Sequence, residues 1–167
     1  MTMSNRAKIA TATALAATLA MAAAPVSAAA QYRQKIGNDM NRCAGSGPAV
    51  RVNVSEIKPG GGKIRVQLYR GTKADWLQSG RWLYRIEASA RAGAMSFCLP
   101  APSAGSYGVA VRHDVNGNGK TDLSTDGGGM SNNPSINILN LGKPSYTKTA
   151  FAVGGEVKAI TIRMRYM

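Results

Sequence analysis

The sequence is poor in the side chains that most catalytic and metal centres need. Its 167 residues include one histidine and two cysteines, which excludes a centre with several histidine ligands and a four-cysteine zinc site. Aromatic residues make up 6% of the chain, too few for platforms that stack nucleic-acid bases. Acidic residues are also scarce, 8 against 21 lysines and arginines, and the formal net charge is +13. The length fits one domain, and the positive charge directs attention to anionic partners.

The uncharged run near the amino terminus is too short to span a membrane. Arg6 and Lys8 precede this run, which covers residues 9–24 and is rich in Ala, Leu and Thr. Small residues then occupy both cleavage-determining positions of Val26–Ala28. The order of these features predicts a Sec-type signal peptide over residues 1–28. We therefore expect a periplasmic or secreted protein that does not span the membrane, with its net charge lowered from +13 to +11.

Two cysteines, Cys43 and Cys98, remain in the predicted mature chain. Exported proteins meet an oxidising compartment, where a pair of cysteines in a small domain is most simply explained as one disulfide. Closing a loop of this length would stabilise the folded state by about 4 kcal/mol through chain entropy. Two free thiols, one of them buried, are the alternative.

Apolar and polar residues alternate along most of the chain after a polar lead-in over residues 29–48. A period of two is typical of half-buried strands. Strands are predicted near residues 50–55, 63–68, 81–89, 94–99, 107–112, 151–153 and 160–166. Glycine and proline turns separate them, and only residues 73–79 suggest a helical turn. The pattern predicts an all-β protein, a single β-sandwich of about seven strands over residues 49–167.

The loop over residues 114–122 carries the most specific chemical pattern in the chain. Oxygen-bearing side chains occupy its positions 1, 3, 5 and 9, a glycine occupies position 6, and position 7 would offer a backbone carbonyl. The candidate calcium ligands are Asp114, Asn116, Asn118, Lys120 through its carbonyl, and Asp122. Position 12 lacks the glutamate of an EF-hand, so a weak site with a dissociation constant of about 0.1–1 mM is expected. A hairpin turn built on the two Asn-Gly pairs explains the same residues, and both interpretations stay open.

His113 directly precedes this loop and invites a catalytic interpretation. A metal-dependent hydrolase that used His113 and Asp114 is the remote alternative to a binding domain. No second histidine and no well-placed nucleophile accompanies His113, so we favour a packed histidine with satisfied ring nitrogens. We therefore expect that the protein is not an enzyme.

The basic side chains are interleaved with apolar residues along the predicted strands. If the strands near residues 50, 64 and 160 share one sheet, one face carries Arg51, Lys63, Arg65, Arg163 and Arg165. Such a face would contact lipopolysaccharide phosphates or another anionic polymer of the cell envelope. Alternation already requires polar residues at solvent-facing positions, and we favour this explanation. Nucleic acid is not an expected partner, because export removes the chain from it and no binding motif is present.

Three segments resemble a bacterial family known as domain of unknown function 2141. They are residues 107–122, with the core His-Asp-Val-Asn-Gly-Asn-Gly, residues 129–133 and residues 142–153. The likeness extends from about Val50 to Tyr166. The resemblance implies an exported sandwich of the prealbumin-like or carboxypeptidase-regulatory-like kind, without an established activity. The expected fold is therefore an immunoglobulin-like or prealbumin-like sandwich. We therefore expect a non-catalytic, monomeric domain with a binding or structural role in the envelope and a calcium-capable loop, or alternatively a basic module that binds anionic envelope components.

Overall fold

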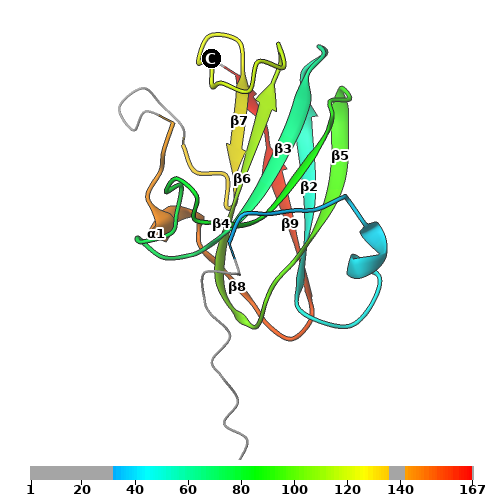
Figure 1. Ribbon diagram of the computed structural model, residues 1–167, viewed down its shortest axis with the longest axis vertical. Helices are drawn as coiled ribbons and strands as arrows, with labels where there is room; N and C mark the ends of the chain where they lie inside the picture. Colours follow the sequence, from blue (N-terminus) through cyan, green and yellow to red (C-terminus); the bar gives the residue numbers. More distant parts are fainter. Residues whose placement is uncertain (1–31, 136–141, 167) are drawn as a thin grey trace, which may run out of the picture.

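The chain folds as two β-sheets packed face to face (Figure 1). The computed structural model describes residues 32–135 and 142–166, so the predicted signal peptide lies outside the described residues. The large sheet has the strand order β1-β4-β3-β6-β7-β10, with β8 paired to β6, and the small sheet has the order β5-β2-β9. No helix in the described part of the chain is long and apolar enough to cross a membrane.

The element bounds confirm the all-β class. The strands are β1 Gln34–Lys35, β2 Ala49–Ile57, β3 Lys63–Arg70, β4 Trp82–Ser89, β5 Gly93–Pro100, β6 Gly105–Asp114, β7 Gly127–Met130, β8 Phe151–Val153, β9 Val157–Arg163 and β10 Arg165–Tyr166. Two short helices, η2 Met40–Cys43 and α1 Tyr146–Thr149, complete the described elements. The described residues thus form ten strands, and not about seven.

Two of the extra strands, β1 and β7, lack a period-two pattern, and the third arises from the division of a predicted strand. Three of the four residues of β7 are glycines, and β1 has only two residues, both exposed. The single carboxy-terminal strand that alternation predicts divides at Met164 into β9 and β10. Strand β7 forms by pairing with β6, β1 by pairing with β4, and β10 by pairing with β7. Such partners cannot be recognised from local sequence.

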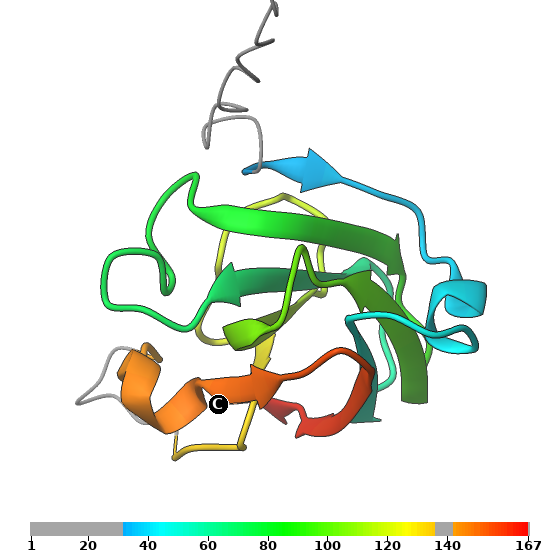
Figure 2. The ribbon, with the colours of Figure 1, turned by 90° about the horizontal axis from the view of Figure 1, so that it is seen from below.

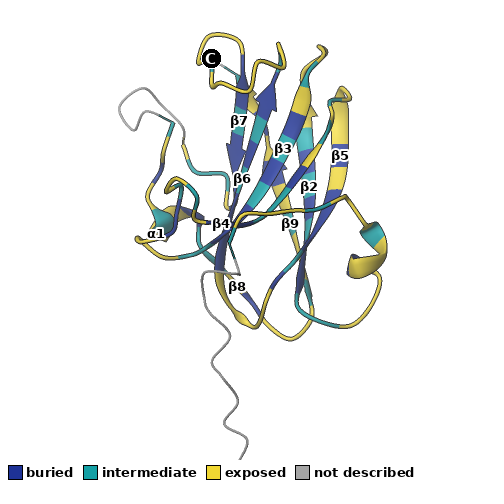
Figure 3. Cartoon of the chain, in the orientation of Figure 1, coloured by how far each residue is buried: buried dark blue, intermediate teal, exposed yellow. Residues whose placement is uncertain are grey.

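The core lies between the two sheets and consists of the apolar phase of the alternating strands. Bands of buried and half-buried residues follow one another along β2 and β3 (Figure 3). The fully buried apolar side chains are Val50, Val52, Val54, Ile64, Val66, Leu68, Leu83, Ile86, Phe97, Leu99, Val109 and Ile162. Because successive side chains of a strand point to opposite faces, the polar phase of each strand faces outward.

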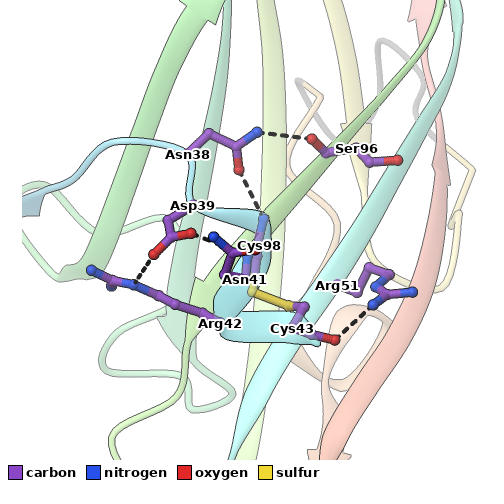
Figure 4. The surroundings of a disulfide bond; sticks show 8 residues. All are labelled: Asn38, Asp39, Asn41, Arg42, Cys43, Arg51, Ser96 and Cys98. Atoms are coloured by element: carbon purple, nitrogen blue, oxygen red, sulfur yellow. Dashed lines mark hydrogen bonds and ion pairs between the residues drawn. A yellow bond between two sulfur atoms is a disulfide. The ribbon is translucent and has the colours of Figure 1, made fainter. Parts of the chain in front are cut away.

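The lead-in is ordered over its described part and joins the edges of both sheets. Strand β1 pairs with β4 of the large sheet, and the chain then runs to η2 beside β5 of the small sheet (Figure 2). There Cys43 forms the predicted disulfide with Cys98 of β5, with Cα atoms 5.9 Å apart. Asn38 supports it by bonding Ser96 O and the Cys98 N–H (Figure 4). The disulfide prediction is confirmed.

A second, smaller apolar cluster covers one end of the outer face of the large sheet. Tyr69, Trp76, Trp82 and Met130 form it, and the turn between β3 and β4 folds over the sheet to supply Trp76. A Cβ atom on Gly108 would lie 2.6 Å from the Trp76 ring, so only glycine permits this close packing. The other end of the same face carries half-buried polar side chains, including Arg65 and Arg112.

Candidate functional site

The sandwich divides the basic face that the sequence predicts. Arg51 lies on β2 and Arg163 on β9, which pair with each other in the small sheet. Lys63, Arg65 and Arg165 belong to the large sheet. The prediction of one shared face is therefore wrong. Strand β3 pairs with β4 and β6, whereas β2 and β9 pair in the small sheet, so the two groups of cations belong to different sheets.

The large sheet instead collects a different set of cations on its outer face. One row of residues across neighbouring strands is Glu87, Arg65, Arg112, Gly128 and Arg165. The next row is Lys35, Arg85, Gln67, Ala110 and Met130. Directly opposite residues of paired strands lie on the same face with Cβ atoms about 5 Å apart. The sheet therefore holds several guanidinium groups side by side.

Three of these arginines are largely buried and share few acidic partners. The side chains of Arg65, Arg85 and Arg112 are 22%, 17% and 17% exposed. Glu87 serves two of them, since its Oε1 lies 2.7 Å from Arg65 Nε and 3.7 Å from Arg85 Nη1. Arg112 Nη2 lies 3.3 Å from Asp114 Oδ2. Three cations thus face two carboxylates.

The positive charges of this cluster repel one another. Arg65 and Arg112 stand directly opposite in the β3–β6 pair, an arrangement that destabilises a sheet when the charges are alike. Burial lowers the pKa of Arg85, and the neighbouring positive charge of Arg65 lowers it further, while Glu87 opposes the change. The Nε atoms of Arg85 and Arg112 are also buried and lack a hydrogen-bond partner. The cluster therefore carries more positive charge than its two acidic partners offset.

Two adjoining hollows lie over this face. Their volumes are about 830 and 740 Å³, within the range of about 300–1,000 Å³ that ligand sites occupy. Both are lined by Arg65, Gln67, Leu77 and Thr121, so they form one continuous surface. The basic residues that line them are Arg33, Lys35, Lys58, Arg65, Arg85, Arg112, Lys143 and Arg165, against the acidic Glu56 and Asp126. We call this surface the basic groove.

The predicted calcium loop reaches the basic groove through Thr121 and is closed by its own hydrogen bonds. The side-chain amides of Asn116 and Asn118 both donate to Asp122 Oδ2, at 2.9 and 2.7 Å. Their Oδ1 atoms accept the backbone N–H groups of Asn118 and Lys120. These two amides, ahead of an opposing effect of burial, lower the pKa of Asp122. The loop thus has the internal bonding of the turn interpretation.

Arg112 holds this loop from the sheet. Its guanidinium donates to Thr121 Oγ1 at 2.8 Å and to Gly119 O at 3.0 Å, in addition to its ion pair with Asp114. Asp114 Oδ2 also accepts the Gly119 N–H, whereas Asp114 Oδ1 is buried and has no partner. Among the described residues, no group of three or more His, Cys, Asp and Glu side chains is placed to hold a metal ion.

The sequence segments that carry the family resemblance line this groove. A family model described as "uncharacterized protein conserved in bacteria (DUF2141)" matches residues 52–161. The chain belongs to the DUF2141 family. The matched range includes Arg65, Arg112 and Gly128 and ends before Arg165.

The other two comparisons add no relative. No curated protein and no solved structure matches the chain. Membership of DUF2141 therefore confirms the predicted family, and likeness to prealbumin stays a prediction.

His113 has the packed position that we favoured from the sequence. It is fully buried, its Nδ1 lies 2.8 Å from Tyr166 Oη, and its Nε2 lies 3.0 Å from Gly61 O. Tyr166 Oη also accepts the Lys58 N–H. A neutral ring that donates from Nε2 and accepts at Nδ1 satisfies all three contacts. In this member of the DUF2141 family, His113 therefore anchors Tyr166 of β10 and the turn at Gly61. It lies away from the outer face of the large sheet.

Sequence reasoning did not assign Arg85 or Arg112 to a site. Arg112 stands in the polar phase of β6, but only the pairing with β3 shows that it faces Arg65. Arg85 follows a bulge at which Trp82 and Leu83 are both buried, which interrupts the alternation of β4. The one signal available in the sequence was that Arg85 is a basic residue out of step with the alternation of apolar and polar residues in its strand.

Proposed function

We propose that this protein is an exported, non-catalytic binding domain of the cell envelope that recognises a phosphate-bearing ligand in the basic groove. The observation that carries the proposal is the group of three largely buried guanidiniums, Arg65, Arg85 and Arg112, which line the basic groove and pair with only two carboxylates. Arginines that serve only to keep a sheet face in contact with water need neither a hollow nor a neighbour of like charge. Their grouping here therefore favours a ligand-binding role over simple solvation.

Phosphate is the chemistry that suits this surface. Guanidinium groups present paired N–H donors that match phosphate oxygens, and the resulting charge-assisted hydrogen bonds are strong. A polyanion that spans the groove would meet cations along its whole length, because Lys35 and Arg85 line one hollow and Arg112 and Arg165 the other. The shared Arg65 would contact a ligand in either position.

Export is part of the same proposal. The disulfide between Cys43 and Cys98 supports it, since such bonds persist in oxidising compartments. The predicted signal peptide supplies the route, and the periplasm or cell surface supplies phosphate-rich polymers and lipids. The absence of catalysis is proposed because the one histidine is buried between two bonded partners.

The proposal is tested by binding to lipopolysaccharide and to its dephosphorylated form. We expect salt-sensitive binding that requires the phosphates and that weakens at least tenfold in the Arg65→Gln, Arg85→Gln double variant. The matched control removes two exposed cations of the small sheet, Lys158→Gln with Arg163→Gln, so both variants have the same net charge. Equal loss of binding in both variants would show attraction to overall charge, and would refute recognition in the groove.

A calcium site at the loop is a second candidate function. It is favoured by the buried Asp114 Oδ1, because a carboxylate oxygen without a partner is costly to bury and calcium prefers oxygen ligands. Calcium would have to displace the amide hydrogen bonds to Asp122. A rise in melting temperature at millimolar calcium, lost in Asp114→Asn, is expected. No shift at that concentration would leave only the turn.

A further inference from the structure

The three glycines of β7 differ in what surrounds them. A Cβ atom at Gly127 would clash with the Tyr166 ring, and one at Gly129 would lie 2.7 Å from Ile162 Cγ2. Packing thus requires glycine at both positions. At Gly128, by contrast, a Cβ atom would meet no atom within 4 Å. Packing therefore gives no reason for glycine at position 128, which lines the basic groove.

Gly128 leaves a gap between two cations. It stands directly opposite Arg112 on β6 and Arg165 on β10. Neighbouring strands are about 4.8 Å apart, so the Cα atoms of the two arginines are separated by roughly 10 Å with bare backbone between them. A phosphate or carboxylate group fits such a gap, with an arginine side chain on each side.

The groove becomes apolar on one side of this gap. Ala110 and Met130 form the adjacent row of the sheet, and Leu77 packs against the same second cluster. Leu123 stands at the rim and is 54% exposed, the only large apolar side chain so exposed among the described residues. Phosphate recognition alone gives no reason for an apolar floor or an exposed leucine.

We propose that the basic groove binds a single-chain anionic amphiphile, an inference that rests on the proposed function and names its ligand class. The anionic head lies over Gly128 between Arg112 and Arg165. The hydrocarbon chain lies along Ala110 and Met130, and Leu123 covers it from the rim. The volume of about 830 Å³ accommodates a head group and one chain.

The test uses alkyl phosphates below their micellar concentrations and follows binding by calorimetry. Methyl, octyl and decyl phosphate share one head group and differ only in chain length. Burying one methylene contributes enough for a three- to fourfold change in affinity. We therefore expect decyl phosphate to bind about tenfold more tightly than octyl phosphate, and methyl phosphate to bind far more weakly than either. Decyl maltoside, which has the chain without the charge, should bind at least tenfold more weakly than decyl phosphate.

Two variants place the ligand in the groove. Gly128→Leu fills the gap at a position where an added Cβ atom meets nothing within 4 Å, and Leu123→Ser removes the apolar rim from an exposed position. Each should weaken decyl phosphate binding at least tenfold. Gly154→Leu is the matched control, because Gly154 is exposed and a Cβ atom there also meets nothing within 4 Å. Unchanged urea midpoints would show that all three variants are folded.

The outcomes separate this inference from the proposed function. Equal affinity for methyl and decyl phosphate, with lipopolysaccharide binding still dependent on Arg65 and Arg85, overturns the amphiphile and leaves anion recognition. If affinity depends on the length of the hydrocarbon chain but Gly128→Leu does not change it, the placement of the anionic head over Gly128 is overturned. If neither alkyl phosphates nor lipopolysaccharide phosphates bind, both proposals fail.

Discussion

Asp75 should make the stability of this domain depend on pH. It lies in the turn that covers the second apolar cluster, and its side chain is only 6% exposed. Its carboxylate accepts hydrogen bonds from Tyr32 Oη at 2.9 Å, Thr72 Oγ1 at 2.7 Å and Arg81 Nε at 2.8 Å. Asp75 thus ties the lead-in, the turn and the start of β4 to one point.

The magnitude follows from these contacts. A hydrogen bond to a charged group contributes about 1.5–3 kcal/mol, against about 1 kcal/mol for a neutral one. Asp75→Asn keeps the shape but removes the charge and turns an N–H₂ group toward one of three donors. Arg81 is 44% exposed, so solvent screens part of its contribution. We therefore expect a loss of about 2 kcal/mol at pH 7, which lowers the urea midpoint by about 1 M.

The pH dependence has a defined sign. Burial alone would raise the pKa of Asp75, but the hydrogen bonds from Thr72 and Tyr32 and the charge of Arg81 hold it below its ordinary value. A carboxylate with a lowered pKa in the folded state stabilises that state fully above its unfolded pKa of about 3.9. This contribution is lost as the pH falls through the lowered value. The deficit of Asp75→Asn should therefore shrink from pH 7 to pH 3.

Urea unfolding followed by tryptophan fluorescence at pH 7, 5, 4 and 3 measures this effect. Comparing variant with parent at each pH cancels the other titrating groups, including Glu87. Asp39→Asn is the control, because Asp39 is half exposed and the amide can still cap η2; its effect should stay below about 0.5 kcal/mol. Equal midpoints at pH 7, or a deficit that does not change down to pH 3, would refute the assigned role.

Three further changes have defined outcomes for stability. Replacing Cys43 and Cys98 by serine should cost about 4 kcal/mol, and reduction of the parent protein should lower its urea midpoint equally; a smaller effect of reduction would contradict the loop-closure account. Gly129→Ala should cost about 1–3 kcal/mol through overpacking, whereas Gly128→Ala should change the melting temperature little, and the reverse order would be inconsistent with the packing of β7. Trp76→Phe should cost about 1 kcal/mol in urea unfolding by removing the hydrogen bond of the indole N–H to Pro144 O, and an unchanged midpoint would contradict that role.

Local pattern was a good guide wherever one residue and its near neighbours decide the outcome. The alternation over residues 50–55 and 63–68 predicted β2 and β3, and glycine and proline predicted the turns between strands. The disulfide prediction followed from having only two cysteines in a chain with a predicted export signal. His113 could be predicted to be packed, because it shares the apolar phase of β6 and lacks catalytic companions.

The candidate site is different, because it depends on which strands are neighbours. Arg51 and Arg65 have the same local pattern, yet one lies on the small sheet and the other in the basic groove. Arg85 is hidden by a bulge, and β7 has no side-chain pattern from which a strand could be predicted. The role proposed for Gly128 depends on Arg112 and Arg165, which are 16 and 37 positions away in the chain.

The sequence by itself determined the two-sided character of the strands, the cross-link and the family. It did so because side-chain alternation and cysteine count are local properties that the backbone converts directly into faces and bonds. Only the tertiary structure decided which polar faces combine into one surface. Hydrogen bonding between strands acts over any distance along the chain, and it placed Arg65, Arg85 and Arg112 together while it sent Arg51 and Arg163 to the other sheet.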